Sequence, residues 1–256
     1  MSRSSIAGSE PCAPASSIKP RTCASKNVEV PQLTPNGVLV RVRAAGICGS
    51  DLHYYFEGKN GDFVIREPLI PGHELAGEVE EIGAGVNRIR PGMRVAVHPG
   101  RNCGDCPACR AGRGNLCRNV FFMGSCSRFP HMQGGFADYV LVNESQCYPV
   151  ARDLPFSTAS FAEPLAVALH AVERAGSLLG RSVLVVGAGP IGLLVLLAAR
   201  RAGAERICIT DILDGPLTLA GRLGADGSVA ISWPRTCGGR RSSERFRQAV
   251  SSSAAR

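Results

Sequence analysis

The sequence predicts two domains, a β-rich, barrel-like domain followed by an α/β domain with a parallel sheet. Three observations carry this prediction. Short strand patterns separated by glycine and proline run from about residue 27 to residue 156. Residues 157–233 then alternate helices with short apolar strands. A glycine-rich turn stands where the first of these strands gives way to a helix, which is the position of a dinucleotide-binding turn.

The first domain contains four segments with strand character. They are rich in β-branched residues, partly alternate between apolar and polar positions, and are bounded by turn residues such as the pair Asn36-Gly37. We expect long loops between them, because the intervening stretches lack periodicity. The four segments are 38–43, 77–82, 94–97 and 136–142.

The second domain begins with helical apolar spacing and continues as a strand–helix–strand unit. Gly203 follows an Ala- and Leu-rich run and is expected to end that helix. A further helix and strand come next, so the order is that of a βαβ unit. The predicted elements are a helix at 157–175, a strand at 182–186, a helix at 191–202, a strand at 207–211, a helix at 216–223 and a strand at 229–231.

Composition excludes several classes of protein. The 256 residues are 45% hydrophobic and 20% charged, which indicates a globular chain. No apolar run has the length of a membrane span and no secretory signal opens the sequence, so we expect a cytoplasmic protein with no membrane partner.

The regions at 1–26 and 234–256 are aperiodic, and we expect disordered tails. Six arginines against Glu244 give the last 23 residues +5 of the net +8, so the basic balance is local. We therefore expect no nucleic-acid partner.

Four of the eleven cysteines lie within fifteen positions, with the spacing C-x2-C-x2-C-x7-C. A tetrahedral zinc ion takes four such thiolates and then has no open position, so the site is expected to be structural. Free or disulfide-linked cysteines are one alternative. A nucleic-acid-binding zinc module is another, although only Arg110 and Arg113 are basic in this loop. The four ligands are Cys103, Cys106, Cys109 and Cys117.

A second metal site is suggested by residues that are far apart in the sequence. Cys48 lies in a Gly-rich segment, and His73 and Glu74 follow Pro71-Gly72. A cysteine, a histidine and a carboxylate would form a mixed-ligand zinc site with room for water or substrate. Alone, each of these residues is a weak signal, because a single cysteine is more often a core residue and a single histidine is often a hydrogen-bonded core or surface residue. Glu163, in a Phe-Ala-Glu-Pro-Leu segment, strengthens the set as a further carboxylate.

The third signal is the turn that runs from Gly187 to Gly192 and contains Gly189, Pro190 and Ile191. Its first glycine permits a tight turn, the second lets the backbone approach a pyrophosphate, and the third lets helix and strand pack closely. Asp211 ends the next predicted strand, 22 residues after the second glycine. An acidic residue there accepts from ribose hydroxyls and repels a 2′-phosphate, so NAD is favoured over NADP. A glycine turn without a ligand is the alternative.

These motifs, in this order, resemble the zinc-dependent medium-chain dehydrogenases from about residue 37 to about residue 231. The resemblance is sharpest in GICGSDLHYYFEGKNGDFVIREPLIPGHE, FFMGSCSRFPHMQGGFADYVLV and FAEPLAVALHAVERAG. These segments are most similar to the polyol branch, which contains L-idonate, sorbitol, xylitol and threonine dehydrogenases, with the L-idonate enzymes nearest.

The resemblance implies a GroES-like catalytic domain at 27–156 and a Rossmann domain at 157–233. It implies a catalytic zinc at Cys48 and His73, with Glu74 and Glu163 as carboxylate candidates, the latter bound directly or through water. Ser50 and His53 match the family's proton relay, and Tyr54 is a candidate for lining the substrate pocket. The resemblance then implies that zinc and NAD are used to oxidise a sugar acid or polyol. For the most similar enzymes the reaction is the oxidation of L-idonate to 5-keto-D-gluconate. It also implies a homo-oligomer.

The sequence also departs from this family. Only two or three strands of a six-stranded nucleotide-binding sheet are recognisable, so the Rossmann domain is predicted to be incomplete. The stretch after Trp233 resembles an out-of-frame extension of a truncated gene, and we expect impaired turnover. The rival hypotheses are an inactive zinc-binding fragment that pairs with a partner, and a nucleic-acid binder that acts through its Arg-rich tail. Lys59, Arg66 and Arg128 are the candidate cations for a substrate carboxylate.

Overall fold

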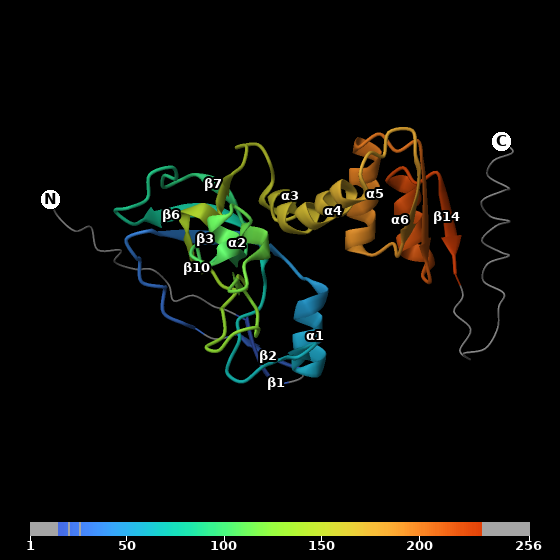
Figure 1. Ribbon diagram of the computed structural model, residues 1–256. Coiled ribbons are helices and arrows are strands. Elements are labelled where there is room, and N and C mark those ends of the chain that lie inside the picture. The colour runs from blue at the N-terminus through green and yellow to red at the C-terminus, as the bar shows by residue number, and fades with distance from the viewer. Residues whose placement is uncertain (1–14, 20, 26, 232–256) are drawn as a thin grey trace, which may run out of the picture. The chain divides into compact units, whose positions relative to one another are not determined.

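The structure is a computed structural model, and it describes residues 15–19, 21–25 and 27–231. The chain divides into two units, the first ending at Glu163 and the second beginning at Pro164. Figure 1 shows the elements of each unit. The predicted tails lie outside the described residues at 1–14 and 234–256. None of the helices in the described part of the chain is both long enough and apolar enough to cross a membrane.

The first unit is organised around a five-stranded antiparallel sheet in the order β10-β3-β6-β7-β11. Four of its strands overlap the predicted segments, with ends that differ from the predictions by up to three residues. The fifth is a short strand that the sequence pattern did not reveal. The strands are β3 (Gly37–Gly46), β6 (Glu74–Ile82), β7 (Arg94–Val97), β10 (Tyr139–Asn143) and β11 (Cys147–Pro149).

Alternating apolar residues hold this sheet together. In β10 every second residue is buried, and Val140 and Val142 reach the same core as Val38 and Val40 of β3. Such an alternation is what one buried sheet face requires. The core continues through β6 and β7, and it also contains Ile89 and Met123 from loops.

Loops and short elements complete the first unit. Helix α1 (Gly49–Glu57) follows β3 directly and is the longest helix in this part of the chain. The remaining elements are two small antiparallel strand pairs, β4 with β5 and β8 with β9, and several short helical turns. They are β4 (Lys59–Asn60), β5 (Phe63–Val64), β8 (Gly100–Arg101), β9 (Phe121–Phe122), α2 (Pro107–Arg110), η1 (Gly114–Leu116), η2 (Glu144–Gln146) and α3 (Phe156–Ala159).

The predicted disordered tail at 1–26 is wrong for residues 15–25. There β1 (Ala15–Lys19) and β2 (Thr22–Ser25) form an antiparallel hairpin. Its turn contains Arg21 at φ 62°, a left-handed conformation that arginine rarely adopts. The N–H of Arg21 donates to the carbonyl of Tyr55 in α1 at 2.5 Å. Backbone pairing rather than an apolar pattern forms this hairpin, so strand periodicity gave no signal for it.

The second unit contains a parallel sheet in the order β12-β13-β14. The strand–helix–strand order is confirmed, with ends that differ from the predictions by at most two residues. The predicted helix at 157–175 is instead divided between α3 and α4, and Pro164 lies in the first turn of α4, where its missing N–H costs no helical bond. The elements are α4 (Ala162–Ala175), β12 (Ser182–Val186), α5 (Pro190–Arg201), β13 (Arg206–Asp211), α6 (Asp214–Arg222) and β14 (Gly227–Ala230).

The core of the second unit lies between the sheet and its helices. Val185, Ile207 and Ile209 of the strands pack with Leu196 of α5 and Leu217 of α6, and all five are buried. Burying a side chain of this size contributes about 1.5–3 kcal/mol. These contacts explain why the apolar strands form one sheet and why the amphipathic helices pack against it.

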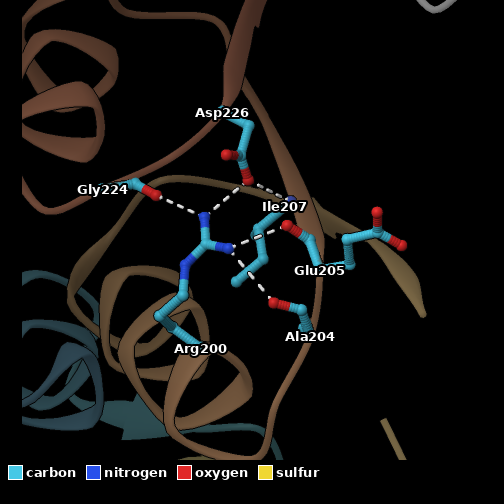
Figure 2. Close-up of polar contacts among 6 residues, drawn as sticks. All are labelled: Arg200, Ala204, Glu205, Ile207, Gly224 and Asp226. Atoms are coloured by element: carbon cyan, nitrogen blue, oxygen red, sulfur yellow. Dashed lines mark hydrogen bonds and ion pairs between the residues drawn. The ribbon is translucent and has the colours of Figure 1, made fainter. Parts of the chain in front are cut away.

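Arg200, near the end of α5, fixes three elements of this unit to one another (Figure 2). Its guanidinium contacts the Asp226 carboxylate at 2.5 Å, and the same carboxylate oxygen accepts the N–H of Ile207 at 2.6 Å. Slight burial raises the pKa of Asp226, but these two donors outweigh it and lower the pKa overall. Arg200 also donates to three carbonyls, those of Ala204, Glu205 and Gly224.

Candidate functional site

Strand pairing brings together residues that lie about 25 positions apart. The end of β3 pairs with the start of β6, so that Gly46 stands opposite Glu74. Cys48 follows β3 as the residue before α1, and His73 precedes β6. The ligand atoms of Cys48, His73 and Glu74 all lie within 4.8 Å of one another. The structure thus assembles three of the four residues predicted for the open metal site.

The Cys48 thiol and the His73 imidazole stabilise each other's charged forms. A hydrogen bond with His73 lowers the pKa of Cys48 and outweighs the opposing effect of partial burial. Burial of His73 favours its neutral form, but Cys48 and Asp51 outweigh that effect and raise its pKa. A thiolate is therefore favoured at Cys48, and the thiolate is the form that binds metal.

Asp51 is a residue that the sequence reasoning missed. It is 5% exposed, and its two carboxylate oxygens accept the backbone N–H groups of Cys48 at 2.9 Å and of Gly72 at 3.0 Å. It therefore ties together the two segments that carry the cysteine and the histidine. An acidic residue three positions after a helix N-cap is the sequence signal that could have revealed it.

The donor set fits zinc. One thiolate, one imidazole and one carboxylate are three protein ligands, the number that catalytic zinc sites have when a fourth position stays open. Nδ1 of His73 is buried, has no hydrogen-bond partner among the residues that the structure describes, and lies 3.9 Å from Asp51 Oδ1. The second nitrogen of a metal-binding histidine typically donates to a carboxylate, and Asp51 lies near this nitrogen but beyond hydrogen-bond distance.

The two carboxylate candidates differ in position. Glu74 belongs to the cluster with Cys48 and His73, whereas Glu163, half-buried at the start of α4, lies outside it. Burial raises the pKa of Glu163, and the nearby His73 opposes that shift while Glu74 adds to it. Burial likewise raises the pKa of Glu74. Glu163 is therefore within electrostatic range of the cluster.

Helix α1 carries the predicted relay residues. Ser50 hydrogen-bonds the Cys48 thiol, and this contact contributes to the lowered pKa of that thiol. His53 lies one turn further on, is exposed, and contacts the Glu57 carboxylate through Nδ1 at 3.0 Å. Tyr54, expected to line a substrate pocket, is instead 2% exposed, and its hydroxyl accepts the N–H of Cys126 at 3.1 Å. Tyr54 is therefore a core residue.

The sulfurs of the four-cysteine loop are spaced as the ligands of a tetrahedral metal ion would be, with all four Sγ atoms within 4.8 Å of one another. Its Sγ atoms lie 3.5 Å apart for Cys106–Cys109 and for Cys117–Cys103, and 3.9 Å apart for Cys103–Cys109. Four sulfurs at about 2.3 Å from one ion would be about 3.8 Å apart, whereas a disulfide requires about 2.05 Å. All four cysteines are free, so the disulfide alternative is wrong for this structure.

Backbone N–H groups surround these sulfurs. Cys117 Sγ accepts from the N–H of Cys103 at 3.4 Å and from that of Asn119 at 3.3 Å. The N–H of Cys109 is the main reason why the pKa of Cys106 falls to about 6. Such donors stabilise the thiolates of Cys106 and Cys117, whereas a hydrogen bond with Asp105 raises the pKa of Cys103 to about 12. A bound divalent ion would favour the thiolate form of all four.

The glycine turn between β12 and α5 has the three properties expected of it. Gly187 has a φ of +97°, which favours glycine. A Cβ at Gly192 would lie 1.9 Å from the carbonyl oxygen of Gly187, so only glycine allows this close approach of helix and turn. A Cβ at Gly189 would meet nothing within 4 Å, which leaves open space above the turn. Pro190 and Ile191 begin α5, whose N-terminus faces the turn.

Asp211, at the end of β13, contacts the same turn. Its carboxylate accepts the N–H of Ala188 at 2.7 Å and that of Leu213 at 3.0 Å, and these bonds lower its pKa. It is therefore ionised at neutral pH. Ile212 and Leu213 follow it and are exposed, so the two residues directly after Asp211 offer no cation for a 2′-phosphate.

The predicted carboxylate-binding cations are not gathered at the metal cluster. Arg128 donates from Nε to the carbonyl of Val120 at 3.0 Å and lies over the Phe121 ring at 4.5 Å. Phe122, not Phe121, packs edge-on against His73 at 5.2 Å. Neighbouring strand residues point to opposite faces, so Arg128 lies on the far side of β9 from His73. No contact within the described residues joins Lys59 or Arg66 to the cluster.

Comparison with known proteins agrees with this geometry. Residues 34–152 match the alcohol dehydrogenase GroES-like domain. The chain is 41% identical to L-idonate 5-dehydrogenase (NAD(P)(+)) of Escherichia coli over 82% of its own length and 62% of that protein. It is 40% identical to sorbitol dehydrogenase of Bos taurus, over 81% of its own length and 57% of that protein.

Solved structures show the same similarity. The crystal structure of the E. coli L-idonate 5-dehydrogenase superposes with a TM-score of 0.80 at 37% identity, covering 89% of this chain and 65% of that one. For 2R,3R-butanediol dehydrogenase from Bacillus subtilis the TM-score is 0.77 at 31% identity, with coverage of 93% and 67%. The chain spans about three fifths of the length of the two sequence relatives. It belongs to the zinc-dependent medium-chain dehydrogenases, with a GroES-like domain followed by part of a Rossmann domain.

Proposed function

We propose that this chain binds one catalytic zinc, one structural zinc and NAD, and that it oxidises a secondary alcohol of a sugar acid or polyol. L-Idonate, oxidised to 5-keto-D-gluconate, is the substrate we propose first, because the L-idonate enzyme is among the most similar relatives. The observation that carries the proposal is the convergence of Cys48, His73 and Glu74 within 4.8 Å. Three different ligand types at this spacing suit a zinc site with an open position.

The proposed roles follow from the contacts. Cys48, His73 and Glu74 hold the catalytic zinc, Asp51 orients the first two, and Glu163 is a further carboxylate that approaches directly or through water. When bound, zinc supplies a Lewis acid that lowers the pKa of a substrate hydroxyl, and NAD supplies the hydride acceptor.

Proton removal is assigned to α1. Ser50 lies two residues after Cys48 in the first turn of α1, and we assign its hydroxyl to take up the substrate hydroxyl proton while it passes its own proton on. His53, three residues later on the same helix, is one turn away and exposed, so it can release that proton to water. Bound NAD would supply the two-electron acceptor, so that loss of this proton and of the carbon-bound hydrogen as hydride would together balance the oxidation.

Cofactor binding is assigned to the second unit. The N–H groups at the start of α5 and the open space at Gly189 suit a pyrophosphate. The ionised Asp211 suits ribose hydroxyls and opposes a 2′-phosphate, so we propose NAD rather than NADP. The four-cysteine loop holds the structural zinc and takes no part in the chemistry.

The test measures metal content and turnover on the purified 256-residue chain. We expect two zinc ions per chain and NAD reduction with L-idonate, with sorbitol and threonine as comparison substrates. Cys48→Ala should lose one zinc and all turnover, whereas Ser50→Ala should keep both ions and lose rate. Cys23→Ser is the matched control, because Cys23 is exposed and belongs to neither cluster.

Three results would count against the proposal. Unchanged zinc content in Cys48→Ala would remove the catalytic site. Two zinc ions with no binding of NADH would instead favour the inactive zinc-binding fragment. Turnover with sorbitol or threonine but not with L-idonate would keep the enzyme class and replace the substrate.

A further inference from the structure

The hairpin of β4 and β5 carries an Asn-Gly pair at its turn. Asn60 ends β4 and pairs with Phe63, so Gly61 and Asp62 form the whole connection. Gly61 has a φ of 59°, whereas Asp62 is outside the left-handed region. A left-handed glycine at the first of two loop positions indicates a type II′ hairpin turn. The hydrogen bond of such a turn joins its first and fourth residues, so the N–H of Gly61 takes no part in it.

The backbone nitrogen of Gly61 is free and accessible. Among the residues that the structure describes, no hydrogen bond involves this N–H group or the side-chain amide of Asn60. A Cβ at Gly61 would meet nothing within 4 Å, so the space around the turn is open. Gly61 is exposed and Asn60 is half-buried. The amide carbon of the asparagine side chain can therefore approach the nitrogen of the next residue without displacing another group.

The other Asn-Gly pair of the sequence, Asn36-Gly37, is held differently. Gly37 is buried, and its N–H donates to the carbonyl of Thr34 at 3.0 Å. Its own carbonyl accepts the N–H of Gly83 at 2.8 Å. A Cβ at Gly37 would lie 2.6 Å from Thr34 Oγ1 and 2.9 Å from Leu141 Cδ1, so the surrounding space is filled. The same dipeptide thus has a bonded, enclosed nitrogen in one place and a free one in the other.

We propose that Asn60 is a site of spontaneous deamidation in the folded chain and that Asn36 is protected from it. The nitrogen of Gly61 attacks the side-chain amide carbon of Asn60 and forms a new C–N bond. The bond from that carbon to the amide nitrogen breaks, and this nitrogen leaves as ammonia with the proton that Gly61 gives up. Water then opens the cyclic imide at either carbonyl and leaves aspartate or isoaspartate. No atom is oxidised or reduced.

The modification changes both the charge and the backbone of the hairpin. A carboxylate replaces a neutral amide two residues before Asp62, so the turn becomes more acidic. Isoaspartate also adds a methylene to the main chain, and a two-residue turn fixes the strand register only at its own length. Gly58, which follows α1, accepts the N–H of Ile65 at 2.9 Å and so joins the hairpin to that helix. We expect isoaspartate to loosen this junction and to speed amide exchange at Ile65.

The inference goes beyond the proposed function, and its test depends on neither zinc nor NAD. The purified full chain is incubated at mildly alkaline pH, where a backbone N–H loses its proton more readily. Isoaspartate is then measured by peptide mapping and by methylation with an isoaspartate methyltransferase. We expect it in the peptide that contains Asn60, and about tenfold less in the Asn36 peptide, because Gly37 must first lose two backbone hydrogen bonds. In urea the two peptides should react at comparable rates, since the fold no longer protects Gly37.

Matched variants identify the reacting residue. Asn60→Gln should remove the isoaspartate signal of the folded chain, because the longer side chain closes a larger and less favourable ring. Asn36→Gln is the control and should leave that signal unchanged. Equal rates at the two sites in the folded chain would overturn the proposal. So would a signal that persists in Asn60→Gln, or an Asn60 peptide that reacts in urea and stays unmodified in the folded chain.

Discussion

Replacing Asp51 with alanine tests whether the metal cluster is held by this one buried carboxylate. Asp51 accepts two backbone N–H groups, at 2.9 and 3.0 Å, from the segments that carry Cys48 and His73. A hydrogen bond to a charged group contributes about 1.5–3 kcal/mol, and alanine leaves both donors unsatisfied, so Asp51→Ala should reduce the free energy of unfolding by about 3–5 kcal/mol. Removing a residue that orients metal ligands also typically weakens metal affinity by about 10–100-fold.

The assay combines urea unfolding with zinc competition against a chromogenic chelator. Asp51→Asn is the informative partner, because its single carbonyl oxygen can keep the bond to Gly72 while its amide group faces another donor at Cys48. We expect roughly half the loss of stability for Asn. The zinc of the four-cysteine loop serves as the internal control and should keep its affinity. Unchanged affinity of the other zinc in Asp51→Ala would refute the positioning role.

Three further predictions concern other parts of the chain. Glu144 accepts the N–H groups of Arg88, Asn87 and Ile89, and these bonds lower the pKa of Glu144 in the folded state. The ionised Glu144 therefore stabilises the fold above its unfolded pKa of about 4.3, and this stabilisation is lost as pH falls through the folded pKa. Between about pH 5 and about pH 3, the range set by these pKa values, the urea midpoint should fall less steeply for Glu144→Gln than for the unsubstituted chain. Equal pH dependence of the two midpoints would contradict this. Arg200→Met should reduce the stability of the second unit by about 2–3 kcal/mol, because it removes the contacts of the guanidinium drawn in Figure 2. An unchanged denaturation midpoint for the helical signal of this unit would exclude the role of Arg200. Gly192→Ala should weaken NADH binding and leave the zinc content unchanged, because the added Cβ would lie 1.9 Å from a carbonyl oxygen. Unchanged NADH affinity would show that the turn can adjust to the methyl group and would contradict this prediction.

Much of the fold could be predicted because the main strands carry their own signals. The β-branched run at β3, the apolar β12 and β13, and the glycine turn all follow local rules of periodicity and backbone conformation. The hairpin β1–β2 could not be found in this way, because backbone bonds and a turn at Arg21 form it. The break before α4 was also missed, since Pro164 was compatible with a helix that continues or one that begins.

From the sequence, only the site residues whose side chains typically bind metal could be predicted. Cys48, His73 and Glu74 were expected by residue type, and the pairing of β3 with β6 explains why they meet. Asp51 was missed because its role depends on Gly72, which only the folded chain brings close. Tyr54 was misplaced for the same reason, since helix position alone does not tell which face of α1 is buried.

X-ray absorption at the zinc edge tests the central claim most directly, because it counts the sulfurs around the bound metal. One zinc held by four cysteines and another held by Cys48 with nitrogen and oxygen ligands give a mean of about 2.5 sulfurs per zinc, at about 2.3 Å. Our account predicts that mean, with two zinc ions per chain. A single zinc surrounded by four sulfurs would contradict it, because Cys48, His73 and Glu74 would then hold no metal.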